Sequence, residues 1–189
     1  SPGKDVLGGG AYIVENFGVG KVVTDGDRLE GALWEAIRES GAEWENLRSI
    51  GEIDVPGGYS ISVMRPEGWE AVEDSAGPRP LALRLEAAGA SFLLAESLDG
   101  EDGRSLGEIY GGEIESTVLF IPGTPDGGSG TVLAGQVKPR ILITEGGESA
   151  APESPKTYSI TEDGAVTVTA DGDAITVKSY EDERALRLE

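Results

Sequence analysis

Histidine and cysteine are both absent from this 189-residue chain. Imidazole and thiolate groups are the usual ligands of zinc and of most transition metals, and they activate most serine and cysteine nucleophiles. Their absence excludes disulfides, Ser-His and Cys-His catalysis, and the common zinc centres. Carboxylates, hydroxyls, lysines and tyrosines remain, so an enzyme of this composition would depend on carboxylate acid–base chemistry or on a hard cation.

Basic residues are scarce as well. The chain has 15 Lys and Arg residues against 35 Asp and Glu residues, which gives a formal net charge of −20. Non-specific binding to nucleic acid or to anionic lipid depends on Lys and Arg, so we expect no nucleic-acid partner. No apolar run is long enough to cross a bilayer, and we expect no direct membrane span in this chain.

Glycine and proline are plentiful, with 29 and 10 residues, and 38% of the chain is hydrophobic. That is enough apolar material to fill the core of one domain. Many turn-forming residues and few long periodic apolar stretches favour short strands over a helical bundle.

Local patterns in the first half predict helices and short strands. Leu29, Leu33 and Ile37 lie on one helical stripe, with Asp27 as a possible cap and Gly41 as the end. Alternation between apolar residues and serines predicts strands that cover one face of a sheet. The helices are expected at 10–17 and 28–40, and the strands at 21–24, 47–50, 51–55, 59–64, 81–85 and 91–95.

The second half is expected to contain a helix at 105–110, strands at 117–121 and 137–144, and loops at 122–130 and 146–155. A closing hairpin at 165–169 and 174–177 is predicted by its Asp171-Gly172 turn. The acidic stretch Asp99-Gly100-Glu101-Asp102-Gly103 has the character of a calcium loop. It lacks the later glutamate of such loops, so we interpret it as a solvated turn.

Four stretches, at 1–17, 81–94, 137–143 and 161–172, occur in an order that resembles the metallo-β-lactamase-like domain at the C-terminus of bacterial DNA-uptake channel proteins. The family's metal loop reads His-x-His-x-Asp-His. The positions that match its ligands hold, in this chain, Ser1, Gly3, Asp5 and Val6, so only the carboxylate is kept.

Two further ligand positions of the family are changed. Glu96-Ser97 stands where the family has Gly-Asp, and Gly123-Thr124 stands where it has a His pair. The degenerate metal-site positions are therefore Ser1, Gly3, Asp5, Val6, Ser97 and Gly123. A site with one carboxylate and no nitrogen or sulfur ligand cannot complete a zinc coordination shell, so we expect no metal, no cofactor and no catalytic residue.

The resemblance implies an α/β (α+β) fold, an αββα sandwich of metallo-β-lactamase type, over residues 1–180 with a C-terminal tail at 181–189. The family's first strands have no counterpart before Ser1. We therefore expect the sandwich to be incomplete in this chain and to be completed by a second polypeptide, produced by cleavage in the former metal loop.

These points predict a non-enzymatic structural module in a homo-oligomeric or filamentous assembly, such as an extracellular or cell-surface filament or pilus-type subunit. Trp34, Trp44 and Trp69 are its candidate interface residues. One alternative is a ligand- or protein-binding module that uses the former active-site cleft. Another is a residual hydrolase that depends on a hard cation.

Overall fold

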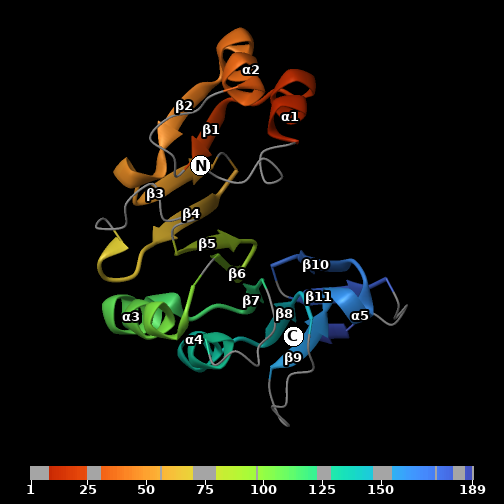
Figure 1. Ribbon diagram of the computed structural model, residues 1–189. Coiled ribbons are helices and arrows are strands. Elements are labelled where there is room, and N and C mark those ends of the chain that lie inside the picture. Colours follow the sequence, from red (N-terminus) through yellow and green to blue (C-terminus); the bar gives the residue numbers. More distant parts are fainter. Residues whose placement is uncertain are drawn as a thin grey trace. The chain divides into compact units, whose positions relative to one another are not determined.

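The structure is a computed structural model, and it describes residues 9–24, 31–55, 57–69, 80–96, 98–122, 129–146, 155–172, 174–180 and 186–188. The chain divides into two compact units (Figure 1). Unit 1 consists of Ser1–Gly51 and Glu70–Arg79, and unit 2 consists of Glu52–Trp69 and Pro80–Glu189.

Unit 1 contains a parallel pair of strands joined by a helix. Strands β1 and β2 pair in parallel with Lys21 opposite Glu43, and α2 forms the crossover between them. Gly41, in the left-handed region at φ 75°, ends α2 as the sequence predicts. The elements are α1 (Gly10–Asn16), β1 (Lys21–Thr24), α2 (Ala32–Ser40), β2 (Glu43–Asn46) and the 3₁₀ turn η1 (Leu47–Ser49).

The two faces of this strand pair differ in polarity. Val22 and Trp44 lie opposite each other and pack against the helices, whose buried residues are Val14, Leu33, Ala36 and Ile37. On the other face, the Lys21 ammonium lies 2.8 Å from a Glu45 carboxylate oxygen and 3.8 Å from one of Glu43. Unit 1 therefore has one apolar layer and one charged, exposed layer.

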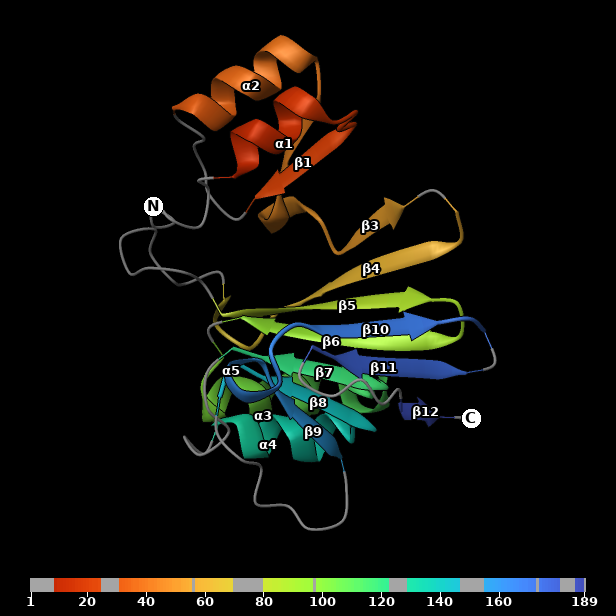
Figure 2. The same cartoon turned by 90° about the vertical axis from the view of Figure 1, so that its right-hand side faces the viewer.

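Unit 2 is built on a seven-stranded sheet in the order β3-β4-β5-β6-β7-β8-β9. Its first four strands form an antiparallel meander, and β6 to β9 run parallel (Figure 2). The strands are β3 (Glu52–Val55), β4 (Tyr59–Met64), β5 (Leu81–Ala87), β6 (Ala90–Glu96), β7 (Val118–Ile121), β8 (Ile141–Thr144) and β9 (Lys156–Ser159).

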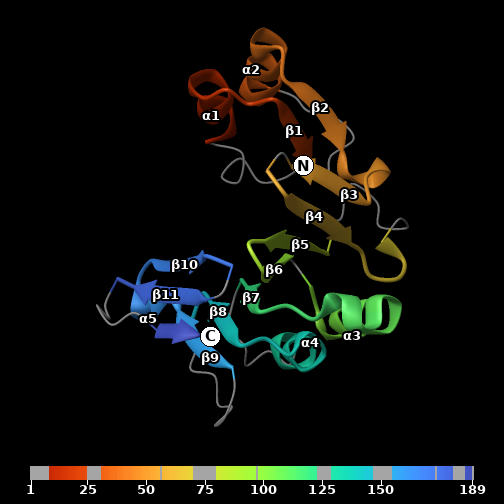
Figure 3. The ribbon, with the colours of Figure 1, turned by 180° about the vertical axis from the view of Figure 1, so that it is seen from behind.

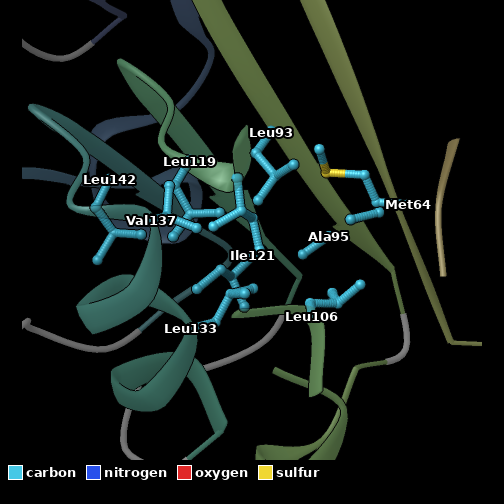
Figure 4. Close-up of a cluster of buried hydrophobic side chains, with 11 residues drawn as sticks. Met64, Leu93, Ala95, Leu106, Leu119, Ile121, Leu133, Val137 and Leu142 are labelled. Atoms are coloured by element: carbon cyan, nitrogen blue, oxygen red, sulfur yellow. The ribbon is translucent and has the colours of Figure 1, made fainter. Parts of the chain in front are cut away.

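The helices α3 (Gly100–Tyr110) and α4 (Ser129–Val137) pack on one face of this sheet. Leu93 and Leu119 are fully buried there, together with Leu106 of α3 and Val137 of α4 (Figure 4). The 3₁₀ turn η3 (Gly111–Ile114) adds Ile114 to the same cluster. This helical layer is the main apolar core of unit 2.

A second, three-stranded antiparallel sheet packs on the other face, in the order β10-β11-β12 (Figures 1 and 3). Its strands are β10 (Val166–Ala170), β11 (Ile175–Ser179) and β12 (Leu186–Leu188), and the short helix α5 (Ile160–Asp163) precedes them. Ile175 and Val177 pack against Val118, Ile141 and Ile143 of the large sheet. Unit 2 is thus a helix–sheet–sheet sandwich.

The two sheets meet at their turns. Gly89, at φ 76° in the β5–β6 turn, approaches Gly172 of the β10–β11 turn so closely that a Cβ on Gly89 would lie 2.8 Å from the Gly172 carbonyl oxygen. Only glycine combines this backbone conformation with this contact.

Several predicted elements are wrong or shifted. Leu47–Ser49 is a 3₁₀ turn rather than a strand, because the Asn46 side chain accepts a hydrogen bond from the Arg48 amide at 2.8 Å. Helix α4 (Ser129–Val137) begins inside the loop predicted at 122–130 and ends at the first residue of the strand predicted at 137–144, and no element was predicted between them. Lys138 at φ 51° and Pro139 then end that helix, so β8 begins only at Ile141. Helix α3 begins at Gly100, and Leu186–Leu188 of the predicted tail pairs with β11.

The predicted fold class is confirmed at the level of a mixed α/β protein built from sheets and helices. The strand pairs β3–β4 and β5–β6 and the closing β10–β11 hairpin lie close to their predicted positions. Among the described residues, no helix has the length and apolar character that crossing a membrane requires.

Candidate functional site

The carboxyl ends of the parallel strands β6, β7, β8 and β9 lie at the same end of the large sheet. Open sheets with parallel strands commonly bind ligands at the carboxyl ends of the strands, so a catalytic or binding site is expected there first. Two of the predicted degenerate positions follow these strands in the sequence: Ser97 comes directly after β6, and Gly123 comes two residues after β7.

All six degenerate metal-site positions lie outside the described residues. They are Ser1, Gly3, Asp5, Val6, Ser97 and Gly123. The prediction that they form the remains of one metal site therefore stays a prediction. The described part of this end of the sheet consists of the ends of the four strands and the residues that follow β7, β8 and β9.

The described residues at this end of the sheet carry hydroxyl groups. Thr144 at the end of β8 is fully buried, and its Oγ1 donates to the Tyr158 carbonyl oxygen at 3.5 Å. Thr161 donates its amide to the Glu145 carbonyl oxygen at 2.9 Å, and its hydroxyl donates to the same oxygen. These bonds join the chain after β8 to helix α5.

Ser159 ends β9 in the same region and is only 4% exposed. Its amide donates to Asp163 Oδ2 at 2.7 Å, while its Oγ has no hydrogen-bond partner among the described residues. A serine hydroxyl needs an adjacent base to act as a nucleophile. The nearby Asp163 carboxylate is already bound to the backbone, so this pair serves to fix the start of α5.

Metal ligands do not gather anywhere in the described part of the chain, where no group of three Asp or Glu residues is placed to hold an ion. The acidic stretch that resembles a calcium loop forms the beginning of α3. Asp99 Oδ1 accepts from the amides of Glu101 at 2.8 Å and Asp102 at 2.9 Å, and Asp102 Oδ2 accepts from the Asp99 amide at 3.0 Å. This reciprocal pair is a capping box.

Burial and the neighbouring carboxylates affect the charge of Asp102 in this stretch. Burial raises the pKa of Asp102 above its ordinary value, opposed by the hydrogen bond from the Asp99 amide, and the neighbouring Asp99 and Glu101 carboxylates raise it further. A depression beside it is lined by Glu67, Asp102 and Arg104 among others. The carboxylates of the cap satisfy helix amides, so we interpret them as structural.

A second depression lies at the β4–β6 end of the large sheet, beside Tyr59, Arg84 and Glu86. The Arg84 guanidinium donates to the Glu115 carbonyl oxygen at 3.3 and 3.4 Å, and it forms an ion pair with Glu86. These contacts fix the arginine against the protein itself. The depression therefore offers polar contacts without an arrangement of nucleophile and base.

The three tryptophans predicted as interface residues occupy two kinds of environment. Trp34 and Trp44 of unit 1 are half-buried, their ring centroids lie 6.0 Å apart in an edge-to-face arrangement, and Trp44 Nε1 donates to Thr24 Oγ1 at 3.0 Å. Trp69 of unit 2 is only 3% exposed. The surface available to a partner from these residues is that of Trp34 and Trp44.

Trp69 is part of a segment that is tied to α3. The Arg65 guanidinium lies 4.9 Å from the centroid of its ring, the Arg65 amide donates to Tyr110 Oη at 3.0 Å, and the Glu67 amide donates to Ser105 Oγ at 2.7 Å. The local sequence does not separate this tryptophan from the other two, because each of the three is followed directly by a glutamate.

No protein-family model matches this chain, and no curated protein matches it. A solved structure from Thermotoga maritima, described as that of a candidate Zn-dependent hydrolase of the metallo-β-lactamase superfamily, is similar at 12% sequence identity with a TM-score of 0.38. The match covers 76% of this chain and 66% of that protein.

Proposed function

We propose that this chain is a non-enzymatic assembly module, a metallo-β-lactamase-like fold without the metal chemistry, which joins a second polypeptide in a larger structure. Two features support the proposal. The sequence has no imidazole or thiolate group, and one sheet of unit 2 has an apolar face that its second sheet covers only in part.

The partly covered face is the observation that carries the proposal. By strand register, Ile61, Leu85 and Phe92 stand in one row with Val118, while Leu83 and Leu94 stand in the next row with Phe120. Phe92, Val118 and Phe120 belong to the cluster under β10–β12. We call the large apolar residues of this face on β4, β5 and β6 that are not buried the open face; they are Tyr59, Ile61, Leu83, Leu85 and Leu94, whereas Val63 and Leu81 of the same face are buried.

None of the open-face residues belongs to an apolar cluster of the described chain. Tyr59 is 46% exposed and Leu94 is 43% exposed, and the other three are half-buried. A row of large apolar side chains on a sheet face is stabilised by a covering layer, at roughly 25 cal/mol for each Å² removed from water. Exposed apolar side chains on a sheet face are typical of sites of protein association when they form a patch.

The strongly acidic composition adds a second expectation. A formal charge of −20 keeps a surface soluble and exposed, and it disfavours tight association between like-charged copies unless a partner supplies positive charge. An exposed position in an extracellular or cell-surface filament, including a pilus-type assembly, fits this composition and forms part of the proposal.

A hydrolase assay separates the assembly module from an enzyme. The purified chain is incubated with Zn²⁺ or Mn²⁺ and with a phosphodiester or a β-lactam substrate, and we expect no turnover above the same metal without protein. Metal-dependent turnover that a chelator abolishes would contradict the non-enzymatic part of the proposal.

A further inference from the structure

Strand β10 presents an unpaired edge beside the open face. Among the described strands, β10 pairs only with β11, and β11 separates it from β12. The Asp171 amide donates to the Ala174 carbonyl oxygen at 3.1 Å, and the Tyr180 amide donates to the Ala165 carbonyl oxygen at 3.0 Å. These bonds show which residues of β10 direct their backbone amide and carbonyl groups toward β11.

In an antiparallel pair, the residues that exchange backbone bonds alternate along the strand. Because residues 165 and 171 bond to the β11 side, residues 167 and 169 do so as well. The amide and carbonyl groups of Val166, Val168 and Ala170 then point away from β11, toward the edge. Their side chains pack in the cluster between the two sheets, so these residues combine buried side chains with an unpaired backbone.

The edge of β10 lies at the level of β5 and β6, whereas β11 lies over the parallel strands (Figures 1 and 2). The close approach of Gly89 to Gly172 also places the β5–β6 turn against the β10–β11 turn. A strand added at this edge would continue the three-stranded sheet across the open face. It would bury Leu83 and Leu94 as β11 buries Val118 and Ile141.

We propose that the open face and the β10 edge together bind one β-strand of a different polypeptide, which pairs with Val166, Val168 and Ala170 and directs alternate apolar side chains onto Leu83 and Leu94. This proposal rests on the proposed assembly function and names its contact. The unpaired backbone of β10 requires an extended partner strand. Because that strand would continue the β10–β12 sheet, it would lie at the same distance from the large sheet as β10 does. The net charge of −20 favours a partner strand with Lys or Arg on its outward side.

Amide hydrogen exchange on the assembly isolated from its natural source tests this contact directly. Compared with the separated chain, the amides of Val166, Val168 and Ala170 are expected to exchange on the order of 100-fold more slowly in the assembly. Thr167 and Thr169 bond to β11 in both states and serve as internal controls. Unchanged exchange at all three edge amides within an assembly would overturn the strand contact while leaving the assembly function in place.

A proline at the edge provides the matched variant. Val168→Pro replaces the branched side chain and removes the outward amide hydrogen, whereas Val168→Ala loses the branched side chain and keeps that amide. We expect Val168→Pro to bind the co-purifying polypeptide about tenfold more weakly than Val168→Ala, because one backbone hydrogen bond is lost. Equal affinities would overturn the contact, and a chain that isolates with no second polypeptide would overturn both the contact and the assembly function.

Discussion

Leu93→Ala is expected to lower the free energy of unfolding of unit 2 by about 3 kcal/mol, whereas Leu94→Ala is expected to lower it by less than about 1 kcal/mol. The two leucines are neighbours on β6 and point to opposite faces of the sheet. Leu93 is fully buried under α3 and α4, so its removal leaves a cavity. Leu94 is 43% exposed on the open face, so its truncation loses little packing in the separated chain.

Urea denaturation of the two variants, followed by circular dichroism, measures this difference. The pair forms its own control, since both changes delete the same atoms from the same strand. Equal losses would mean that Leu94 is as well covered as Leu93, and the open face would then not exist. In the assembly, the Leu94 variant should lose more stability than it does in the separated chain, because the partner strand covers that position.

Trp69→Ala is expected to lower the free energy of unfolding by about 4 kcal/mol, the typical loss for truncating a buried tryptophan. The ring is 3% exposed, and Arg65 lies over it, in a segment whose backbone is bonded to Tyr110 and Ser105 of α3. Removing the ring leaves a cavity at a buried position and takes away the aromatic face that the Arg65 guanidinium contacts.

Trp34→Ala provides the comparison for Trp69→Ala. Trp34 is half-buried and contacts Trp44 edge to face, so its loss should cost clearly less, about 1 to 2 kcal/mol. Thermal unfolding of both variants measures the difference. If Trp69→Ala were no more destabilising than Trp34→Ala, the assignment of Trp69 to the core would be wrong.

The sequence predicts strands best where alternation and turn chemistry agree. Asp171-Gly172 and Gly89 marked two hairpins that the structure confirms. The strand β2 was missed because Glu43-Trp44-Glu45 carries one apolar residue between two charges, and its partner β1 lies 22 residues earlier. Pairing across such a distance depends on the crossover helix and leaves no local signal.

Helix α4 was missed for a related reason. Its sequence, Ser-Gly-Thr-Val-Leu-Ala-Gly-Gln-Val, contains two glycines and two β-branched valines, which are typical of loops and strands. Packing of Leu133 and Val137 against the large sheet outweighs these weak preferences. The open face could not be predicted either, because alternation along β4, β5 and β6 indicates an apolar face without indicating what covers it.

For the candidate site, the sequence alone is more informative than it is for the fold. The absence of imidazole and thiolate groups is a property of the whole sequence, and it defines the chemistry before any fold is known. The structure adds that the carboxylates of the acidic turn before α3 bind backbone amides, and that the described end of the parallel strands carries hydroxyls. Neither result depends on the degenerate positions outside the described residues.

The mass of the native particle tests the central claim most directly. The chain alone has a mass of 19.7 kDa. Native mass spectrometry of the protein purified from its natural source without denaturant should show a larger particle, which releases this chain and at least one different polypeptide when it is dissociated. A folded particle of 19.7 kDa as the sole species would contradict the account.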